Sequence, residues 1–408
     1  MLPLADARSQ ILETVSRLPA MPTPLADCLG LVLAEDVVAG HDIPPFDNSA
    51  MDGYAVKAAD VMSVPVSLPV VEDVPAGTAP TVEVEAGQAI KIMTGAPLPT
   101  GADTIIRVED TTPGDGLVTI TTGAAIGTSV RRAGGDIAEG STVVRAGTRL
   151  GPNHLGVLAS VGAAAPPVFR RPRVAVVSTG DELVPYDTAE LRPGQIRGTN
   201  GLVLVSVLEE LGATVVDLGI VGDDARELKS ALARGAAEAD AVVTSGGVSM
   251  GEYDLVKAVL TELGGIEFWQ VAMQPGKPFA FGMIDGTPLF GLPGNPVSVF
   301  VAFEQFVRPA LLHMMGSPRL FRHRLTGVLD EEVETNPEKT VFLRVTVDWH
   351  GAVAHARPSG GQDSNVLSAL ASADALAVIP VGTGRVGAGS RVDLEMFRYP
   401  EDHGLSSR

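Results

Sequence analysis

The sequence contains a single cysteine, Cys28, among its 408 residues. One cysteine excludes an internal disulfide framework and is typical of a reducing compartment. Aromatic residues are also scarce, at 4%, although hydrophobic residues make up 45% of the chain. The hydrophobic core must therefore consist mainly of Ala, Val, Leu and Ile.

Long apolar runs and positive charge are lacking as well. No run of about 18 apolar residues without a charge occurs, so no membrane-spanning helix is predicted. Residues 1–20 mix acidic and polar residues with apolar ones, which is not the pattern of a signal peptide. The formal net charge of -19 argues against a nucleic-acid-binding surface, which needs a basic face. We therefore expect a cytoplasmic protein that binds neither nucleic acid nor membranes.

Several common catalytic patterns are absent. The seven histidines show no zinc-ligand spacing, and the chain has no Walker phosphate-binding loop. No Ser-His-Asp or Cys-His arrangement has local support. The candidates that remain are glycine-rich turns that carry carboxylates.

The chain is longer than a single small core requires, and its regions differ in pattern. Residues 1–50 begin with a helical pattern and continue as an extended segment, and residues 136–170 contain a short strand and a helix. Residues 51–135 have the short alternating runs of a β-rich region. Strands alternate with helices in residues 171–319, and residues 320–408 return to a β pattern.

The alternation in residues 171–319 predicts a doubly wound, parallel α/β sheet with helices on both faces. Ligands of such sheets bind at the carboxyl ends of the strands. Three glycine-containing peptides are expected at that edge: STGDELV at 178–184, TSGGVSMGEYD at 244–254 and GLPGNPVS at 291–298.

TSGGVSMGEYD combines features that favour opposite charges. Its glycines can expose N–H groups to an anion. Its carboxylates, Glu252 and Asp254, suit a hard cation such as Mg²⁺, which commonly bridges carboxylates to phosphates. The alternative is a simple turn in which Asp254 caps the following helix. The peptide is therefore a candidate for a metal–phosphate pair.

Further acids and a lysine extend this candidate site. Asp181 and Glu182 follow one predicted strand, and GDDAREL places Asp223 and Asp224 after another. One acid of the second pair is expected to be a helix N-cap, and the other could lie on the same edge. Lys277, in QPGKPFAFG, lies on a backbone fixed by proline and could contact an oxyanion. The alternatives are turns with solvated side chains.

Two other peptides, PPFDNSAMDGYAV at 44–56 and MTGAPLPTGAD at 93–103, are polar and not periodic. They could be buried turns or functional loops. Both peptides belong to a set of motifs that also includes IMTGAPLPTGADTIIRVED, VRRAGGDIAEG, VVSTGDEL, TSGGVSMGEYDLVK, PGKPFAFG and GLPGNPVSV. In this set of motifs the chain resembles the molybdopterin molybdenumtransferase family of the MoeA/gephyrin type. The motifs occur in the family's order and span nearly the whole chain.

The resemblance implies a multidomain α+β fold and a homodimer. A discontinuous linking domain would comprise residues 1–50 and 136–170, with an inserted β-rich domain at 51–135. The α/β domain at 171–319 would bind the pterin, and residues 320–408 would form a β barrel. The implied reaction inserts molybdenum from molybdate into adenylylated molybdopterin, with Mg²⁺-dependent release of AMP.

The resemblance also implies roles for individual residues. The implied catalytic residues are Asp254, Asp52, Thr94 and Asp224, of which Asp52 and Thr94 belong to the inserted domain and would act across the dimer. The implied metal ligands are Asp254, Glu182 and Asp223. The implied contacts to the pterin, the adenylate or molybdate are Ser178, Thr179, Asp181, Glu182, Ser245, Gly246, Gly247, Ser249, Lys277, Pro293, Asn295, Ser298, Arg344 and Ser364, with Lys277, Ser298, Arg344 and Ser364 as the molybdate candidates.

Two positions depart from the family pattern. Gln274 stands where the family often has a basic residue, and Asp363 stands where a small residue is commoner. The lost positive charge at Gln274 would weaken the oxyanion site or change its selectivity, and Asp363 bears on the same molybdate assignment. Two other functions stay open: a molybdopterin adenylyltransferase, whose loop would read more like TTGGTG, and a non-catalytic dimeric scaffold that binds the pterin. The adenylyltransferase could also be a partner that hands over the adenylylated pterin.

Overall fold

The computed structural model describes residues 1–246, 259, 262 and 265–399. Their contacts divide the chain into two compact units. Unit 1 comprises residues 1–21, 30–32 and 169–408, and unit 2 comprises residues 22–29 and 33–168.

Unit 1 contains a six-stranded mixed sheet. Its strand order is β17 (Thr214–Val221), β14 (Arg173–Thr179), β18 (Ala241–Ser245), β22 (Thr287–Leu292), β21 (Pro278–Ile284), β19 (Ile266–Gln270). The first four strands are mutually parallel, as the sequence predicted. The residues after Lys277, for which the sequence predicted no strand, form β21, which is antiparallel to both of its neighbours.

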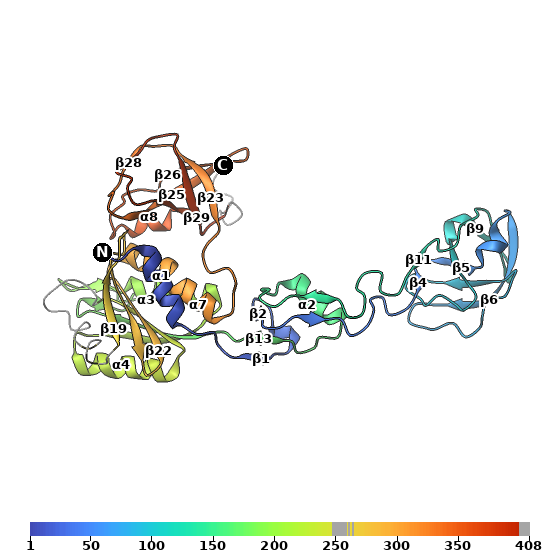
Figure 1. Ribbon diagram of the computed structural model, residues 1–408, viewed down its shortest axis with the longest axis horizontal. Helices are drawn as coiled ribbons and strands as arrows, with labels where there is room; N and C mark the ends of the chain where they lie inside the picture. Colours follow the sequence, from blue (N-terminus) through green and yellow to red (C-terminus); the bar gives the residue numbers. More distant parts are fainter. Residues whose placement is uncertain (247–258, 260–261, 263–264, 400–408) are drawn as a thin grey trace. The chain divides into compact units, whose positions relative to one another are not determined.

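Helices cover both faces of this sheet because buried side chains alternate along its strands. Val176 of β14 packs in the core with α1 (Leu4–Thr14) and α3 (Thr199–Leu211). The next residue, Val177, packs on the other face with α4 (Ala225–Glu238). Figure 1 shows α4 on the side of the sheet opposite α1 and α3. The doubly wound architecture is confirmed.

Unit 1 also contains a closed β barrel. The barrel strands are β25 (Thr340–His350), β26 (Val353–Pro358), β23 (Arg324–Leu329), β29 (Arg391–Met396) and β27 (Ala375–Ile379), and pairing of β27 with β25 closes the circle. A short strand from the α/β region, β20 (Met273–Gln274), pairs in parallel with β25. The C-terminal β barrel expected from the sequence is therefore present.

A buried polar network lies where the helix after β22 meets the barrel. That helix runs as α6 (Pro296–Ala302), a π-helical turn (Phe303–Val307) and α7 (Arg308–Met314). The turn carries Glu304, which is 5% exposed and accepts hydrogen bonds from Arg322 at 2.6 and 2.9 Å. The paired guanidinium compensates the buried carboxylate.

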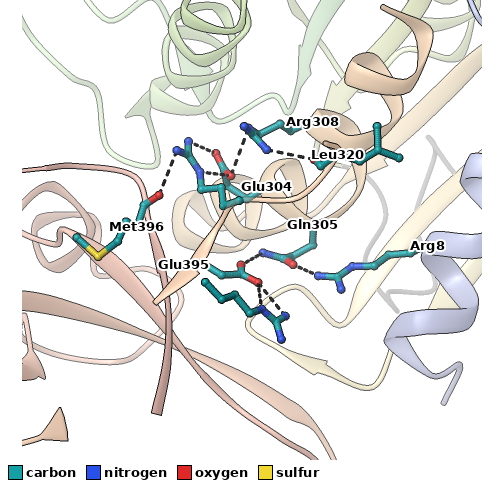
Figure 2. A network of polar contacts seen from close by, with 9 residues as sticks. Arg8, Glu304, Gln305, Arg308, Leu320, Glu395 and Met396 are labelled. Atoms are coloured by element: carbon teal, nitrogen blue, oxygen red, sulfur yellow. Dashed lines mark hydrogen bonds and ion pairs between the residues drawn. The ribbon is translucent and has the colours of Figure 1, made fainter. Parts of the chain in front are cut away.

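The neighbouring Gln305 extends this network to the barrel (Figure 2). Its Nε2 donates to Glu395 of β29 at 2.9 Å, and its Oε1 accepts a hydrogen bond from Arg8 of α1. Glu395 also accepts from Nη2 of Arg324 at 2.9 Å. The network therefore joins the first helix, the α/β region and the barrel of unit 1.

Unit 2 is built mainly of short strands. Its largest sheet has the order β8 (Thr104–Arg107), β5 (Gly53–Val56), β7 (Ala89–Ile92), β6 (Val66–Val74), β10 (Leu117–Ile120), β9 (Thr111–Pro113). Two small pairs accompany it: β4 (Asn48–Ser49) with β11 (Val130–Arg131), and β3 (Val37–Val38) with β12 (Thr142–Val144). Unit 2 also contains α2 (Pro152–Ser160) and the buried Cys28.

The remaining elements are short. They are β1 (Ala20–Pro22), β2 (Val32–Leu33), β13 (Pro167–Phe169), β15 (Leu183–Val184), β16 (Ile196–Arg197), β24 (Val333–Glu334), β28 (Arg385–Val386), α8 (Leu367–Ala371) and the 3₁₀ turns Leu25–Asp27, Ala58–Val61 and Val108–Asp110. Within the described residues, none of the helices has the length and apolarity needed to span a bilayer.

Candidate functional site

A cavity of about 940 Å³ lies at the carboxyl ends of the parallel strands of unit 1. It is the position at which open α/β sheets bind ligands, since strand ends and the following turns converge there. It brings together these residues named from the sequence: Ser178, Thr179, Glu182, Asp223, Ser245, Gly246, Lys277, Pro293, Asn295, Ser298 and Ser364. Their individual roles stay predictions.

The turn after β18 shows why a glycine is required there. Gly246 has φ +96°, and a Cβ at this position would lie 2.7 Å from the carbonyl oxygen of Thr179. Ser245 Oγ lies 3.3 Å from Ser178 Oγ, and Thr179 Oγ1 donates to the Ser245 carbonyl at 3.4 Å. The two strand ends therefore approach each other closely and present small polar side chains to the cavity.

The structure separates the roles of the two acids after β17. Asp223 lines the cavity, and its N–H donates to Asp181 Oδ1 at 2.8 Å. Asp181 does not line the cavity and instead fixes this loop. Asp224 accepts hydrogen bonds from the N–H groups of Glu227 and Arg226, at 3.0 and 2.9 Å, and these bonds lower the pKa of its carboxyl. Asp224 is thus the N-cap of α4.

The barrel contributes one wall of the cavity. Ser364 Oγ accepts a hydrogen bond from Asn295 Nδ2 at 2.8 Å, and the Ser364 carbonyl accepts one from the N–H of Val297 at 3.2 Å. Gln362 and Asp363 line the cavity beside it. This loop therefore contacts the start of α6 directly.

Arg344 lies behind this wall and not in it. The residue is 1% exposed, and its Nη2 donates to the carbonyls of Gly361 and Asp363 at 3.3 Å each. Burial lowers the pKa of its guanidinium to about 10, and the Asp363 carboxylate opposes that shift. Arg344 borders a second hollow of about 760 Å³, which shares Gln274 and Gln362 with the main cavity. Its contacts hold the loop that faces the main cavity.

Sequence reasoning missed two residues of the cavity that precede and begin α3. Arg197 donates through its guanidinium to the carbonyls of Thr188 and Ala189, at 2.7 to 3.0 Å. Asn200 Nδ2 donates to the Gly294 carbonyl at 2.6 Å, whereas its buried Oδ1 has no partner among the residues that the structure describes. The start of a helix at the strand edge, GTNGLV, was the available signal for Asn200.

The order of the strands separates the charges along the cavity. Asp223 follows β17 and Glu182 follows β14, at one end of the sheet edge, whereas Lys277 precedes β21 toward the other end. Lys339, which sequence reasoning also missed, precedes the barrel strand β25 and lines the cavity too. The two acids therefore define an acidic end of the cavity, where Arg197 also lies, and the two lysines define a basic end, while Asp363 lines the cavity from the barrel loop. Within the described part of the chain, no group of three or more His, Cys, Asp and Glu side chains could hold a metal ion.

The other predicted residues lie elsewhere. Asp52 and Thr94 meet in unit 2, where Thr94 N and Oγ1 both donate to Asp52 Oδ1 at 2.7 Å. Both bonds lower the pKa of the Asp52 carboxyl, and the bond from the backbone N–H contributes most. Gly247, Ser249 and Asp254 lie outside the residues that the structure describes.

Comparison with known proteins extends over nearly the whole chain. Residues 2–162 match the MoeA N-terminal region (domain I and II), residues 175–313 a probable molybdopterin binding domain, and residues 326–397 the MoeA C-terminal region (domain IV). The fold and the cavity thus define a protein whose α/β domain is of the molybdopterin-binding class. The chain belongs to the MoeA family, the family that its motifs resemble.

Individual relatives agree with this assignment. The chain is 43% identical over 382 residues to molybdopterin molybdenumtransferase 2 of Mycobacterium tuberculosis, covering 91% of this chain and 93% of the relative. It is 36% identical to molybdopterin molybdenumtransferase of Haemophilus influenzae, with 98% and 99% covered. The crystal structure of a molybdopterin biosynthesis MoeA protein from Pyrococcus horikoshii matches with a TM-score of 0.85 and 35% identity, over 98% of this chain and 100% of that one.

Proposed function

We propose that the protein is a molybdopterin molybdenumtransferase, which inserts molybdenum from molybdate into adenylylated molybdopterin with Mg²⁺-dependent release of AMP. Relatives with this name match the chain over nearly their full length. The observation that carries the proposal is the division of charge in the cavity. An anionic nucleotide-like substrate needs a cation beside the protein's acids, whereas molybdate needs lysines and N–H groups.

The acidic end is suited to Mg²⁺. Glu182 and Asp223 both line the cavity, and no third acid of the described residues joins them in a metal-binding group. Mg²⁺ is usually held by one or two carboxylates, with substrate phosphates and waters as its other ligands, so this donor set fits the ion. We assign Glu182 and Asp223 as its ligands together with Asp254. Bound Mg²⁺ would neutralise the charge of the substrate's phosphates.

The pterin and adenylate are assigned to the strand ends of the cavity. The small side chains after β14 and β18, Ser178, Thr179 and Ser245, would let the substrate approach the backbone. Asn200 Oδ1 is a buried acceptor without a described partner, so it can receive a hydrogen bond from an N–H or O–H group of the substrate. Asp181 positions Asp223 through its hydrogen bond to the loop.

The basic end is assigned to molybdate. Lys277 supplies a point charge, and Ser298 and Ser364 supply hydroxyl groups on the same cavity. Arg344 would act indirectly, because its hydrogen bonds go to the carbonyls of the loop that carries Ser364. Gln274, which also lines the cavity, would leave this end with less positive charge than a basic residue would.

The remaining predictions belong to this proposal. The protein would act as a cytoplasmic homodimer and would receive its pterin from an adenylyltransferase. Asp254 would support hydrolysis of the adenylyl group, and Asp52 and Thr94 would be supplied by a second copy of the chain. Asp224, which does not line the cavity, would act only through α4, because its carboxylate is engaged as a helix cap.

The decisive experiment is single-turnover release of AMP from adenylylated molybdopterin with Mg²⁺, in the presence and absence of molybdate. The variants are Glu182→Gln and Asp223→Asn, with Glu209→Gln as a control on the exposed side of α3. We expect each cavity variant to slow AMP release roughly ten- to hundredfold, the cost of losing a charged contact. The control should release AMP like the wild type.

Molybdate should accelerate AMP release by the wild-type protein and should yield the molybdenum-loaded pterin. Binding of the adenylylated pterin without any AMP release would contradict the proposal and favour a scaffold. Formation of adenylylated pterin from molybdopterin and ATP would identify an adenylyltransferase instead.

A further inference from the structure

Lys339 is a cationic residue that the barrel delivers to the cavity of the α/β region. It lies immediately before β25, and Met273 and Gln274 of β20 pair with Thr340 and Val341 of that strand. The N–H of Thr340 also donates to the carbonyl of Ala272 at 2.9 Å. This pairing holds Lys339 next to the segment that leads into Lys277, and both lysines line the cavity.

The backbone of Lys339 is fixed by a braced turn. Asn336 Oδ1 accepts a hydrogen bond from the N–H of Glu338 at 2.9 Å, and the Asn336 carbonyl accepts one from Lys339 at 3.2 Å. The Pro337 carbonyl accepts a further bond from Gly382 at 2.7 Å. The backbone that carries the lysine side chain is therefore fixed, so no backbone entropy is lost when the ammonium group binds a ligand.

The basic end of the cavity has few charges to offer a ligand. Arg197, the other cavity-lining cation of the described residues, lies beside Glu182 at the acidic end, and its guanidinium is engaged with backbone carbonyls. Lys277 and Lys339 form no ion pair with any residue in the described ranges. Asp363 also lines the cavity and would repel an anion, but its charge is partly balanced by the buried Arg344. Two ammonium groups thus remain for a ligand.

We propose that Lys339 is a specificity-determining residue that, with Lys277, binds the dianionic tetrahedral oxyanion substrate. This inference rests on the proposed function, because it assigns the oxyanion to the basic end of the cavity. Two separated ammonium groups favour a dianion over a monoanion of the same shape, since each contributes its own Coulomb attraction. Gln274 is exposed and neutral, so the second positive charge at this end, besides that of Lys277, comes from Lys339.

Isothermal titration calorimetry of the full-length protein with molybdate and with perrhenate tests this proposal. Perrhenate is a tetrahedral monoanion of similar size. We expect Lys339→Gln to weaken molybdate binding about tenfold and to weaken perrhenate binding less. Lys339→Arg should retain most of the affinity. Lys229→Gln removes an exposed lysine that pairs with Glu262 on another part of unit 1 and should bind molybdate like the wild type.

A relocated charge provides the second test. The double variant Gln274→Lys/Lys339→Gln restores a cation beside the vacated position and should recover molybdate affinity, which a merely structural defect would not allow. Unchanged molybdate binding by Lys339→Gln, with normal binding by the wild type, would overturn the assignment of Lys339 and leave the proposed function standing. Failure of the wild type to bind molybdate would overturn both the oxyanion site and the role of Lys339.

Discussion

At the scale of single residues, Gly246 combines two constraints that can be separated by mutation. Its φ of +96° disfavours any side chain, and a Cβ would meet the Thr179 carbonyl at 2.7 Å. We expect Gly246→Ala to lower the free energy of unfolding by ~2–3 kcal/mol, measured by urea denaturation, because backbone strain and a clash add. Gly219→Ala, at φ +77° with open space around it, should cost only ~1–2 kcal/mol. Equal losses for the two variants would contradict a role for the clash.

The residues of the cavity differ in how far sequence could predict them. Ser178, Glu182 and Gly246 were predictable because they lie at or shortly after the carboxyl ends of strands of the α/β pattern, and these ends meet at one edge. Lys339 was not, because it reaches this edge through the pairing of β20 with β25, which no local pattern in the sequence indicates. Asp224 could have been a cap or a rim acid, and only its hydrogen bonds decide for the cap.

At the scale of elements, β29 carries two acids that contact the same arginine, one of them buried and the other exposed. Glu395 is 3% exposed and accepts bonds from Gln305 and Arg324, whereas Asp393 pairs with Arg324 at 3.5 Å on the surface. We expect Glu395→Ala to lower the free energy of unfolding of the protein by ~3 kcal/mol, because it leaves the buried Gln305 amide without its acceptor and removes a partner of Arg324. Asp393→Ala should cost no more than ~1 kcal/mol.

Urea denaturation of the full chain measures both changes. The two variants remove a carboxylate from the same strand, so similar losses would show that burial of the network in Figure 2 adds nothing to its strength. Recovery of stability in Glu395→Gln, which keeps an acceptor for Arg324, would support the hydrogen-bonding explanation.

The strands and helices of the α/β region can be predicted from the sequence where the periodicity of hydrophobic residues is clear. TVVDLGIV has the apolar pattern of a strand and ARELKSALARGAAEA the pattern of a helix, and they coincide closely with β17 and α4. The strand β21 was missed because QPGKPF reads as a turn. Its antiparallel pairing with β22 nevertheless had a local signal, Asp285-Gly286, whose φ values of +49° and +85° suit a tight hairpin.

At the scale of the whole molecule, the two units are expected to differ in acid sensitivity. Hydrogen bonds lower the pKa of four carboxyl groups in unit 2, namely Asp47, Asp52, Glu72 and Asp110. In the described part of unit 1 the lowered carboxyl groups are Asp224 and Asp240. A carboxyl group with a lowered pKa stabilises the fold above its ordinary pKa of about 4, and this stabilisation is lost as pH falls through the folded-state pKa.

We therefore expect unit 2 to loosen first on acidification. Hydrogen exchange followed by mass spectrometry at about pH 7 and about pH 3.5, each corrected for intrinsic exchange, should show the larger loss of protection in the strands β5 and β7. Earlier loss of protection in β14 and β18 of unit 1 would contradict this expectation.

The two ends of the long segment of unit 2, residues 33–168, adjoin each other, which bears on how this segment could be exchanged in evolution. They lie side by side because the N–H of Ala34 donates to the carbonyl of Pro167 at 2.9 Å. A segment with adjoining ends can lengthen, shorten or be exchanged without separating the residues on either side of it. Residues 33–168 therefore have the geometry of a cassette, through which relatives could acquire different binding surfaces without a change in the α/β sheet of unit 1.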